Sequence, residues 1–382
     1  MHQRRIRSGE ITLGEPLPWN LYNDKGVLLL AEGGRITHAP QLERLLDMGI
    51  YIESSVAWHL SPSTALQRCL HACYQLDRLL ARPEAIADFP HAIHEVTQLL
   101  RQAQHRDPRV VIATVVLRRG GRHSVRQAVN TATVCCAVLA QMGADESLIR
   151  ATLGAALTMN IGMLELQDSL ARQSLPLTPS QRARVERHPI DGAELLQALG
   201  VNDQDWLRAV REHHEANDGS GYPNHLAGEA IAPAAQLVGL ADLFCARVSE
   251  RGYRPAHCAR LVLRDILIER GRLFDARLAA YFIKALGVYP VGSVVTLKNG
   301  DVGVVAAPTD QVDAPLVHAL RDGHGIAFAR PRPRDTREAD LRITGSLPLA
   351  DLGVPVDMVA IWGSEAADFD LNHLKPHEVD VG

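Results

Sequence analysis

The chain has 382 residues, of which 46% are apolar and 22% charged, and its formal net charge is −4. It can therefore bury a large core, and its length is that of two or three domains. The small net charge excludes a whole-protein attraction to nucleic acid or to an anionic membrane, and the longest apolar run is too short to cross a bilayer. The six cysteines lack zinc-ribbon spacing, which predicts reduced thiols in a cytoplasmic protein of bacterial type.

The spacing of apolar residues and turn signals changes twice along the chain, which predicts three domains. Residues 1–60 alternate short apolar runs with turn signals and predict a small β-rich domain that includes a short helix. Residues 61–287 carry apolar side chains at three- and four-residue spacing, which predicts a helical domain. Residues 288–382 return to strand signals and end in an acidic tail. The predicted fold class is mainly α, with a helical bundle between two β-rich segments.

Two turn signals support the β-rich segments. The stretch from Asp24 to Gly26 is a plausible hairpin turn in the first segment. In the second, Asn299 and Gly300 form the dipeptide most typical of a two-residue hairpin and join two apolar runs.

Two adjacent histidines end a predicted helix in the middle of the chain, in the stretch DQDWLRAVREHHEAND. Asn202 or Asp203 is a good N-cap, and Trp206 belongs to the apolar stripe of this helix. The spacing places His213 and His214 on the interior side. A single inward histidine is usually a satisfied core residue, whereas two adjacent ones are harder to satisfy. Both satisfied core histidines and a shared metal remain open.

Three other segments offer metal ligands. Asp242 is nearly alone among apolar neighbours, where a buried carboxylate needs a cation or strong donors. A capping box of Thr178 and Gln181 predicts a helix that contains His188, and His123 begins another amphipathic helix. Imidazoles with one carboxylate suit iron, manganese or zinc better than calcium or magnesium. The candidate ligands are His123, His188, His213, His214 and Asp242.

The order of these residues resembles the HD-GYP family, a subgroup of the HD-superfamily phosphohydrolases. The stretch HHEANDGSGYP is similar to the family's GYP signature, and the resemblance has its core over residues 123–287. It implies a helical bundle around a di- or trinuclear iron or manganese site, and hydrolysis of cyclic di-GMP. It also implies that the five candidate ligands occupy family metal positions. The GYP loop would comprise Asp218, Gly219, Gly221, Tyr222 and Pro223.

The sequence departs from the family at the motif that gives it its name. The stretch ALTMNIGM stands where the family reads approximately LLHDIGK, so that Met159, Asn160 and Met163 replace histidine, aspartate and lysine. Cys245 replaces a further acidic residue. The resemblance implies that the lost aspartate bridges two metals, and a neutral amide is a poor bridge. We therefore expect no intact catalytic set, and at most one metal, iron or manganese, held by the three remaining central histidines, or none.

The stretch RGYRPA resembles the family segment whose basic residues hold the nucleotide phosphates. Arg251 and Arg254 match those positions, and guanidinium groups suit bidentate phosphate contacts. The alternative is that both arginines lie on a solvated surface.

We interpret the chain as an HD-GYP-type cyclic di-GMP signalling protein with a degenerate phosphodiesterase centre. It would act by binding the nucleotide, or a protein partner through the GYP loop, with no nucleic-acid or membrane partner; a homodimer remains open. One alternative is an active phosphodiesterase with an altered metal site. The other is a helical interaction module that does not bind cyclic di-GMP.

Overall fold

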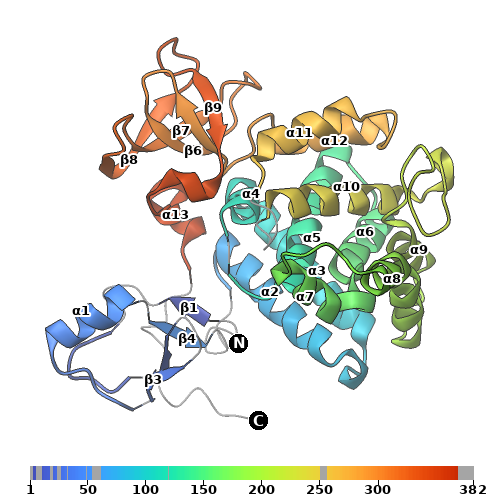
Figure 1. The fold of residues 1–382 in the computed structure, drawn as a ribbon, viewed down its shortest axis with the longest axis horizontal. Helices are drawn as coiled ribbons and strands as arrows, with labels where there is room; N and C mark the ends of the chain where they lie inside the picture. Colours follow the sequence, from blue (N-terminus) through green and yellow to red (C-terminus); the bar gives the residue numbers. More distant parts are fainter. Residues whose placement is uncertain are drawn as a thin grey trace. The chain divides into compact units, whose positions relative to one another are not determined.

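The computed structural model describes residues 3–5, 11–17, 20–23, 27–31, 33–48, 50–53, 62–118, 120–249 and 256–368. The chain divides into two compact units. Residues 64–118 and 123–367 form the larger unit, and the described residues before 64 belong to the smaller one (Figure 1). The turn expected from Asp24 to Gly26 and the acidic tail beyond residue 368 lie outside the described residues.

The smaller unit has an antiparallel sheet with strand order β1-β4-β2-β3 and one helix. Leu21, Ile36 and Ile50 are fully buried within it. The predicted β-rich N-terminal region with a short helix is therefore confirmed. Its elements are β1 (Gln3–Arg5), β2 (Leu21–Tyr22), β3 (Leu28–Leu30), α1 (Ala39–Met48) and β4 (Tyr51–Glu53).

Helices make up most of the larger unit, which confirms the predicted mainly α fold (Figure 1). The helices before the histidine pair are α2 (Ala65–Ala81), α3 (Phe89–Arg106), α4 (Pro108–Leu117), α5 (His123–Met142), α6 (Glu146–Thr158), α7 (Leu164–Arg172), α8 (Pro179–Ala198) and α9 (Gln204–Glu212). Those after the pair are α10 (Pro233–Val248), α11 (Ala259–Ile268) and α12 (Ala276–Leu286).

Local capping signals set where several of these helices begin. Thr178 accepts a hydrogen bond from Gln181 N, and the Gln181 side chain accepts one from Thr178 N, so the predicted capping box opens α8. Asp203 caps α9 by accepting from the amides of Asp205 and Trp206. These caps satisfy amides that have no partner within their helix, and they fix the start of the two helices that carry the central histidines.

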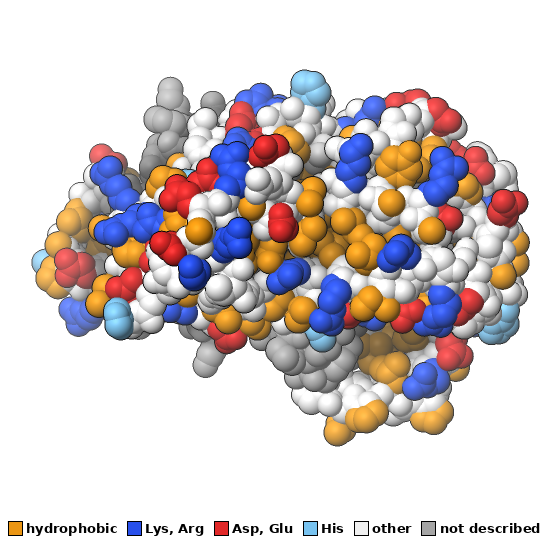
Figure 2. Space-filling model, turned by 90° about the horizontal axis from the view of Figure 1, so that it is seen from above, with side chains coloured by type: hydrophobic (Ala, Val, Ile, Leu, Met, Phe, Trp, Pro, Cys, Tyr) orange, Lys and Arg blue, Asp and Glu red, His pale blue; other side chains and the backbone are white. Residues whose placement is uncertain are grey.

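Helix α5 runs through the middle of the helical part and contacts α2, α3, α4, α6, α7, α10 and α12 (Figure 1). Ala132 and Val138 on it are fully buried. The stretch Glu146–Arg172 is long and apolar enough to cross a membrane by length and composition, but 61% of its apolar window is buried inside the protein. That burial is typical of a core helix. On the face shown in Figure 2, basic and acidic side chains are interspersed, as the small net charge leads one to expect.

A five-stranded antiparallel sheet with order β8-β7-β6-β5-β9 follows the helices. Gly300, with φ +90°, turns β5 into β6, and Asn299 Oδ1 accepts from Asp301 N at 3.0 Å, so the predicted hairpin is confirmed. Val294 and Val304 pack into the same core as the helices. The elements are β5 (Val294–Leu297), β6 (Val302–Ala307), β7 (Leu316–Arg321), β8 (Ala327–Asp335), β9 (Ile343–Leu347) and α13 (Met358–Trp362).

The last described turns close back onto the start of the larger unit. Thr64 Oγ1 donates to Ala367 O at 2.8 Å, and Ala65 N donates to Glu365 Oε2 at 2.8 Å. The guanidinium of Arg106, at the end of α3, pairs with the same Glu365 carboxylate. The N-terminus of α2 is thus completed by residues from the other end of the unit.

Candidate metal centre

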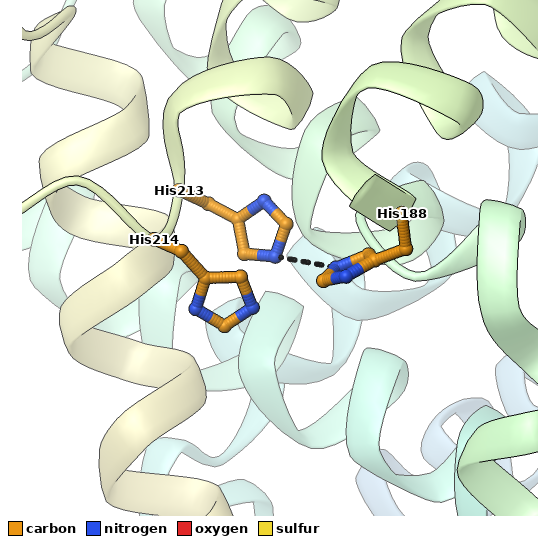
Figure 3. Close-up of side chains that lie close together, drawn as sticks. All are labelled: His188, His213 and His214. Carbon is orange, nitrogen blue, oxygen red and sulfur yellow. Dashed lines mark hydrogen bonds between the residues drawn. The ribbon is translucent and has the colours of Figure 1, made fainter. Parts of the chain in front are cut away.

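Three imidazoles gather where α8 and α9 meet. His188 lies in α8 immediately before Pro189, His213 is the C-cap of α9, and His214 is the next residue. One ring nitrogen from each lies within 4.8 Å of the others (Figure 3). His188 and His213 are buried, whereas His214 is half-buried. The sequence placed both histidines of the pair on the inward side of their helix, but α9 ends at Glu212 and His214 already belongs to the loop.

The hydrogen bonds of two rings determine which nitrogen is available. His188 Nδ1 donates to Val185 O at 2.5 Å, and His213 Nδ1 donates to Val210 O at 2.7 Å. A carbonyl oxygen only accepts, so the proton of each neutral ring is on Nδ1 and the lone pair is on Nε2. Metal-ligating histidines characteristically donate their other nitrogen to a carbonyl or carboxylate in this way.

The two Nε2 atoms face each other at 3.3 Å (Figure 3). Two lone pairs at this distance repel unless a proton or a cation lies between them. Two imidazole nitrogens, each about 2.0–2.1 Å from one metal ion at tetrahedral or octahedral angles, lie roughly 2.9–3.4 Å apart. The observed separation falls in that range. His188 and His213 therefore fit a shared transition-metal ion, and a ring nitrogen of His214 lies within 4.8 Å of theirs.

Burial keeps all three rings in the neutral form that binds metals. It lowers the pKa of His188 to about 3, with a further contribution from the neighbouring His213. Burial likewise lowers the pKa of His213 to about 4. The pKa of His214 lies well below its usual value because of burial and the two other imidazoles. No proton has to be displaced from Nε2 at neutral pH.

The GYP loop packs directly against His214. The Tyr222 ring stacks on the His214 ring with centroids 4.6 Å apart, and Tyr222 N donates to His214 O at 3.1 Å. At Gly221 any side chain is excluded, because a Cβ would lie 2.4 Å from His214 O and 2.3 Å from Ala216 N. The glycine thus lets the loop approach the histidine backbone closely enough for the tyrosine to cover the ring.

Two carboxylates hold the shape of this loop. Glu215 accepts from Asn224 N at 2.7 Å and from Leu226 N at 3.0 Å. Asp218 accepts from Ser220 N at 3.0 Å, and Arg272 Nη1 donates to its other oxygen at 3.1 Å. Asp218 therefore braces the loop, as does Gly219, whose φ is +80°. The role of Glu215 was missed at the sequence level, because its partners lie nine and eleven residues further along an irregular segment.

Asp242 and His123 lie beside the three-histidine cluster rather than within it. Gln127 Nε2, one turn along α5 from His123, donates to Asp242 Oδ1 at 2.7 Å and to Asp242 O at 3.0 Å. His123 Nδ1 accepts from Arg126 at 3.3 Å. Gln127 supplies part of the compensation that the sequence required for Asp242. The contact with Gln127 joins residues 115 positions apart, and no local signal predicted it.

The residues at the altered motif lie in two different environments. The Met159 side chain is fully buried in the apolar core of the helical part. Asn160 and Met163, by contrast, line a cavity. Asn160 is 5% exposed, and its Oδ1 accepts no hydrogen bond from the described part of the chain. Cys245 is fully buried, and burial raises its pKa, so it offers no carboxylate and no thiolate here.

The cavity beside the cluster has a volume of about 460 Å³. Its walls bring together residues that are far apart in the sequence. Its volume lies within the range of about 300–1,000 Å³ that is typical of small-molecule sites. Residues of the site that line it are His123, Asn160, Met163, His214, Tyr222 and Asp242. Arg251 and Arg254, the expected phosphate ligands, lie outside the described residues.

We expect the purified protein to hold at most about one iron or manganese ion per chain after preparation with added Fe(II) or Mn(II). The substitution His213→Ala removes one of the two facing Nε2 lone pairs and should lower metal affinity at least about tenfold. Metal analysis of the two proteins side by side measures both effects. The matched control is His91→Ala on the exposed face of α3, which should keep the parent's metal content. Two tightly held metals in the parent would contradict this expectation.

Comparison with known proteins identifies the helical part. Residues 109–278 match the model of the HD domain family. The cyclic di-GMP phosphodiesterase PA4108 of Pseudomonas aeruginosa is 27% identical over 288 residues, 75% of this chain and 66% of that protein. The cyclic di-GMP phosphodiesterase response regulator RpfG of Xanthomonas campestris pv. campestris is 37% identical over 147 residues, 37% of each chain. Both matches cover less than two thirds of the relative's own length.

A solved structure shares the fold of this chain over nearly all of that structure's own length. Bd1817, an HDG"Y"P protein from Bdellovibrio bacteriovorus, has a TM-score of 0.51 and 17% identity, over 74% of this chain and 99% of that chain. At this identity the likeness concerns the fold alone. The family match and the cyclic di-GMP phosphodiesterase relatives confirm the resemblance drawn from the sequence.

Proposed function

We propose that this chain is an HD-GYP-type cyclic di-GMP-binding protein with a degenerate phosphodiesterase centre. It acts through the bound nucleotide, or through a protein partner at the GYP loop, rather than by hydrolysis. The observation that carries the proposal is the environment of the altered motif. Met159 is wholly within the apolar core, and the cavity presents the neutral side chains Asn160 and Met163 where a charged pair would be needed.

The residues present support one metal position more readily than two. His188, His213 and His214 offer three neutral nitrogens, whereas Asn160 offers only an uncharged carbonyl oxygen. An ion held by the three histidines supplies Lewis-acid polarisation of a phosphate oxygen when bound. Tyr222 holds the ring of His214 in place by stacking, and Gln127 holds the Asp242 carboxylate. The cavity between them binds and orients the nucleotide but offers no nucleophile activated by two metals.

A second candidate function, hydrolysis by an altered one-metal site, is favoured by the same three histidines. The facing Nε2 lone pairs of His188 and His213 support a metal site over a satisfied core cluster. Metal content alone does not separate binding from slow hydrolysis. A rate measurement does.

Cyclic di-GMP should bind the unmodified protein with Arg251 and Arg254 as its main phosphate contacts. Each charge-assisted contact contributes about 1.5–3 kcal/mol, so replacing both by alanine should weaken binding at least about a hundredfold. Calorimetric titration at one fixed salt concentration measures the change. The control pair Arg330→Ala and Arg332→Ala on β8, at exposed positions outside the cavity, should leave the affinity unchanged. If the unmodified protein gives no heat and no competition at high micromolar nucleotide, the proposal fails.

A further inference from the structure

A second cavity lies against the same histidine pair. It has a volume of about 350 Å³ and is enclosed by α10, by the start of α12 and by the backbone after α9. His214 and Asp242 line both this cavity and the one of about 460 Å³ described above. The two residues form a common wall between the cavities.

The walls away from this common boundary belong to different elements. The first cavity is closed by α7 and by the loop that follows it, with apolar Leu170 and Leu175 and the amides Gln167 and Gln173. Gln167 is 9% exposed, and its Oε1 accepts no hydrogen bond from the described residues. An amide side chain in an apolar pocket can both donate to and accept from the edge of a nucleobase.

The second cavity combines apolar and polar walls in the same way. Phe274 and Leu278 provide the apolar surface, and Gln236 and Arg247 provide polar groups. Each cavity lies in the lower half of the usual size range of small-molecule sites, about 300–1,000 Å³, which suits one nucleoside better than two. A ligand that fills both must have two lobes and a linker that passes the common wall.

We propose that the two cavities form one bipartite site that takes a cyclic dinucleotide whole, with one nucleoside in each cavity and the ring that joins the nucleosides passing His214. The inference rests on the proposed function and adds to it the division of the ligand between two pockets. It explains why His214 is the half-buried member of the cluster, since its ring forms part of both pockets. A mononucleotide would occupy only one half of the site.

Two half-buried alanines allow each cavity to be closed separately. Ala171 on α7 lines only the first cavity, and Ala246 on α10 lines only the second. We expect both Ala171→Phe and Ala246→Phe to weaken cyclic di-GMP binding at least about tenfold, because each ring fills the place of one nucleoside. Ala171→Ser and Ala246→Ser, which change the volume little, should bind like the parent. Calorimetric titration gives the affinities, and the thermal midpoint of each variant reports whether it is folded.

A measurement on the unaltered protein covers the case in which a phenylalanine variant does not fold. Cyclic di-GMP with a photoreactive azide on each base should cross-link to peptides from residues 163–177 and also to peptides from 236–247 or 273–278. If the parent binds but only one phenylalanine variant is weakened, or cross-links come from one cavity alone, the bipartite site is overturned while the proposed function stands. If the parent does not bind cyclic di-GMP at all, the proposed function and the bipartite site fail together.

Discussion

Cyclic di-GMP should be hydrolysed by this protein at least about a thousandfold more slowly than by the Pseudomonas aeruginosa phosphodiesterase assayed beside it, with Fe(II) or Mn(II) supplied to both. A thousandfold corresponds to about 4 kcal/mol of transition-state stabilisation. Two-metal sites reach such values by activating the nucleophile and stabilising the leaving oxygen together. The neutral Asn160 and the buried Met159 remove the groups that would hold a second metal. Turnover in the per-second range that a chelator abolishes would contradict this prediction.

The triple replacement Met159→His, Asn160→Asp and Met163→Lys is the informative control. It should allow a second metal to bind but restore only part of the rate. The structure gives the reason, because Met159 is packed on all sides in the apolar core and an imidazole there must displace its neighbours. Cys245 also still lacks the carboxylate expected at its position. Metal content and initial rate, measured on the same preparation, separate the two effects.

Gly239→Ala should disrupt the histidine site by pushing on its backbone. A Cβ at this position of α10 would lie 2.2 Å from His213 O. No protein tolerates such a contact, so either α10 or the His213 backbone must move. We expect a loss of about 1–3 kcal/mol in the free energy of unfolding and at least about a tenfold loss in metal affinity. Denaturant unfolding and metal titration measure these changes.

Gly192→Ala is the matched control for this variant. Gly192 lies in α8, one turn after His188, and a Cβ there would meet its neighbours at 3.5–3.6 Å, an ordinary contact. Alanine also favours the helix over glycine by up to about 1 kcal/mol, so this variant should be as stable as the parent or slightly more so. If Gly239→Ala keeps both the stability and the metal affinity of the parent, the close packing of α10 on His213 is not what shapes the site.

Local features of the sequence were sufficient to predict the helices and strands and much of the site. Thr178 and Gln181 predicted the start of α8, Gly300 predicted a hairpin, and the apolar spacing placed His213 on the inward face of its helix. That His188 shares a site with His213 followed from the family resemblance. Each of these signals acts over a few residues, where backbone geometry and hydrogen bonding are determined by the neighbouring side chains.

Features that depend on how helices pack could not be predicted in this way. The hydrogen bond from Gln127 to Asp242 joins α5 to α10. The boundary between the two cavities depends on the position of His214 after α9 has ended, whereas the sequence had placed His214 within that helix. The amphipathic pattern predicts which face of a helix is buried, but not which polar side chain of a distant helix it will meet.

The ties between α2 and Glu365 also bear on the order in which the protein can assemble during its synthesis. The hydrogen bonds at Thr64 and Ala65 span 303 and 300 positions of the chain. At a translation rate of about 5–20 residues per second, roughly 15–60 s pass between the synthesis of Thr64 and Ala65 and the synthesis of their partners. Until then the Arg106 guanidinium and the Ala65 amide lack the Glu365 carboxylate as their partner. A ribosome that stalls before residue 365 would therefore release a chain in which α2 lacks these C-terminal contacts. Chaperones or proteases would encounter the chain in that state.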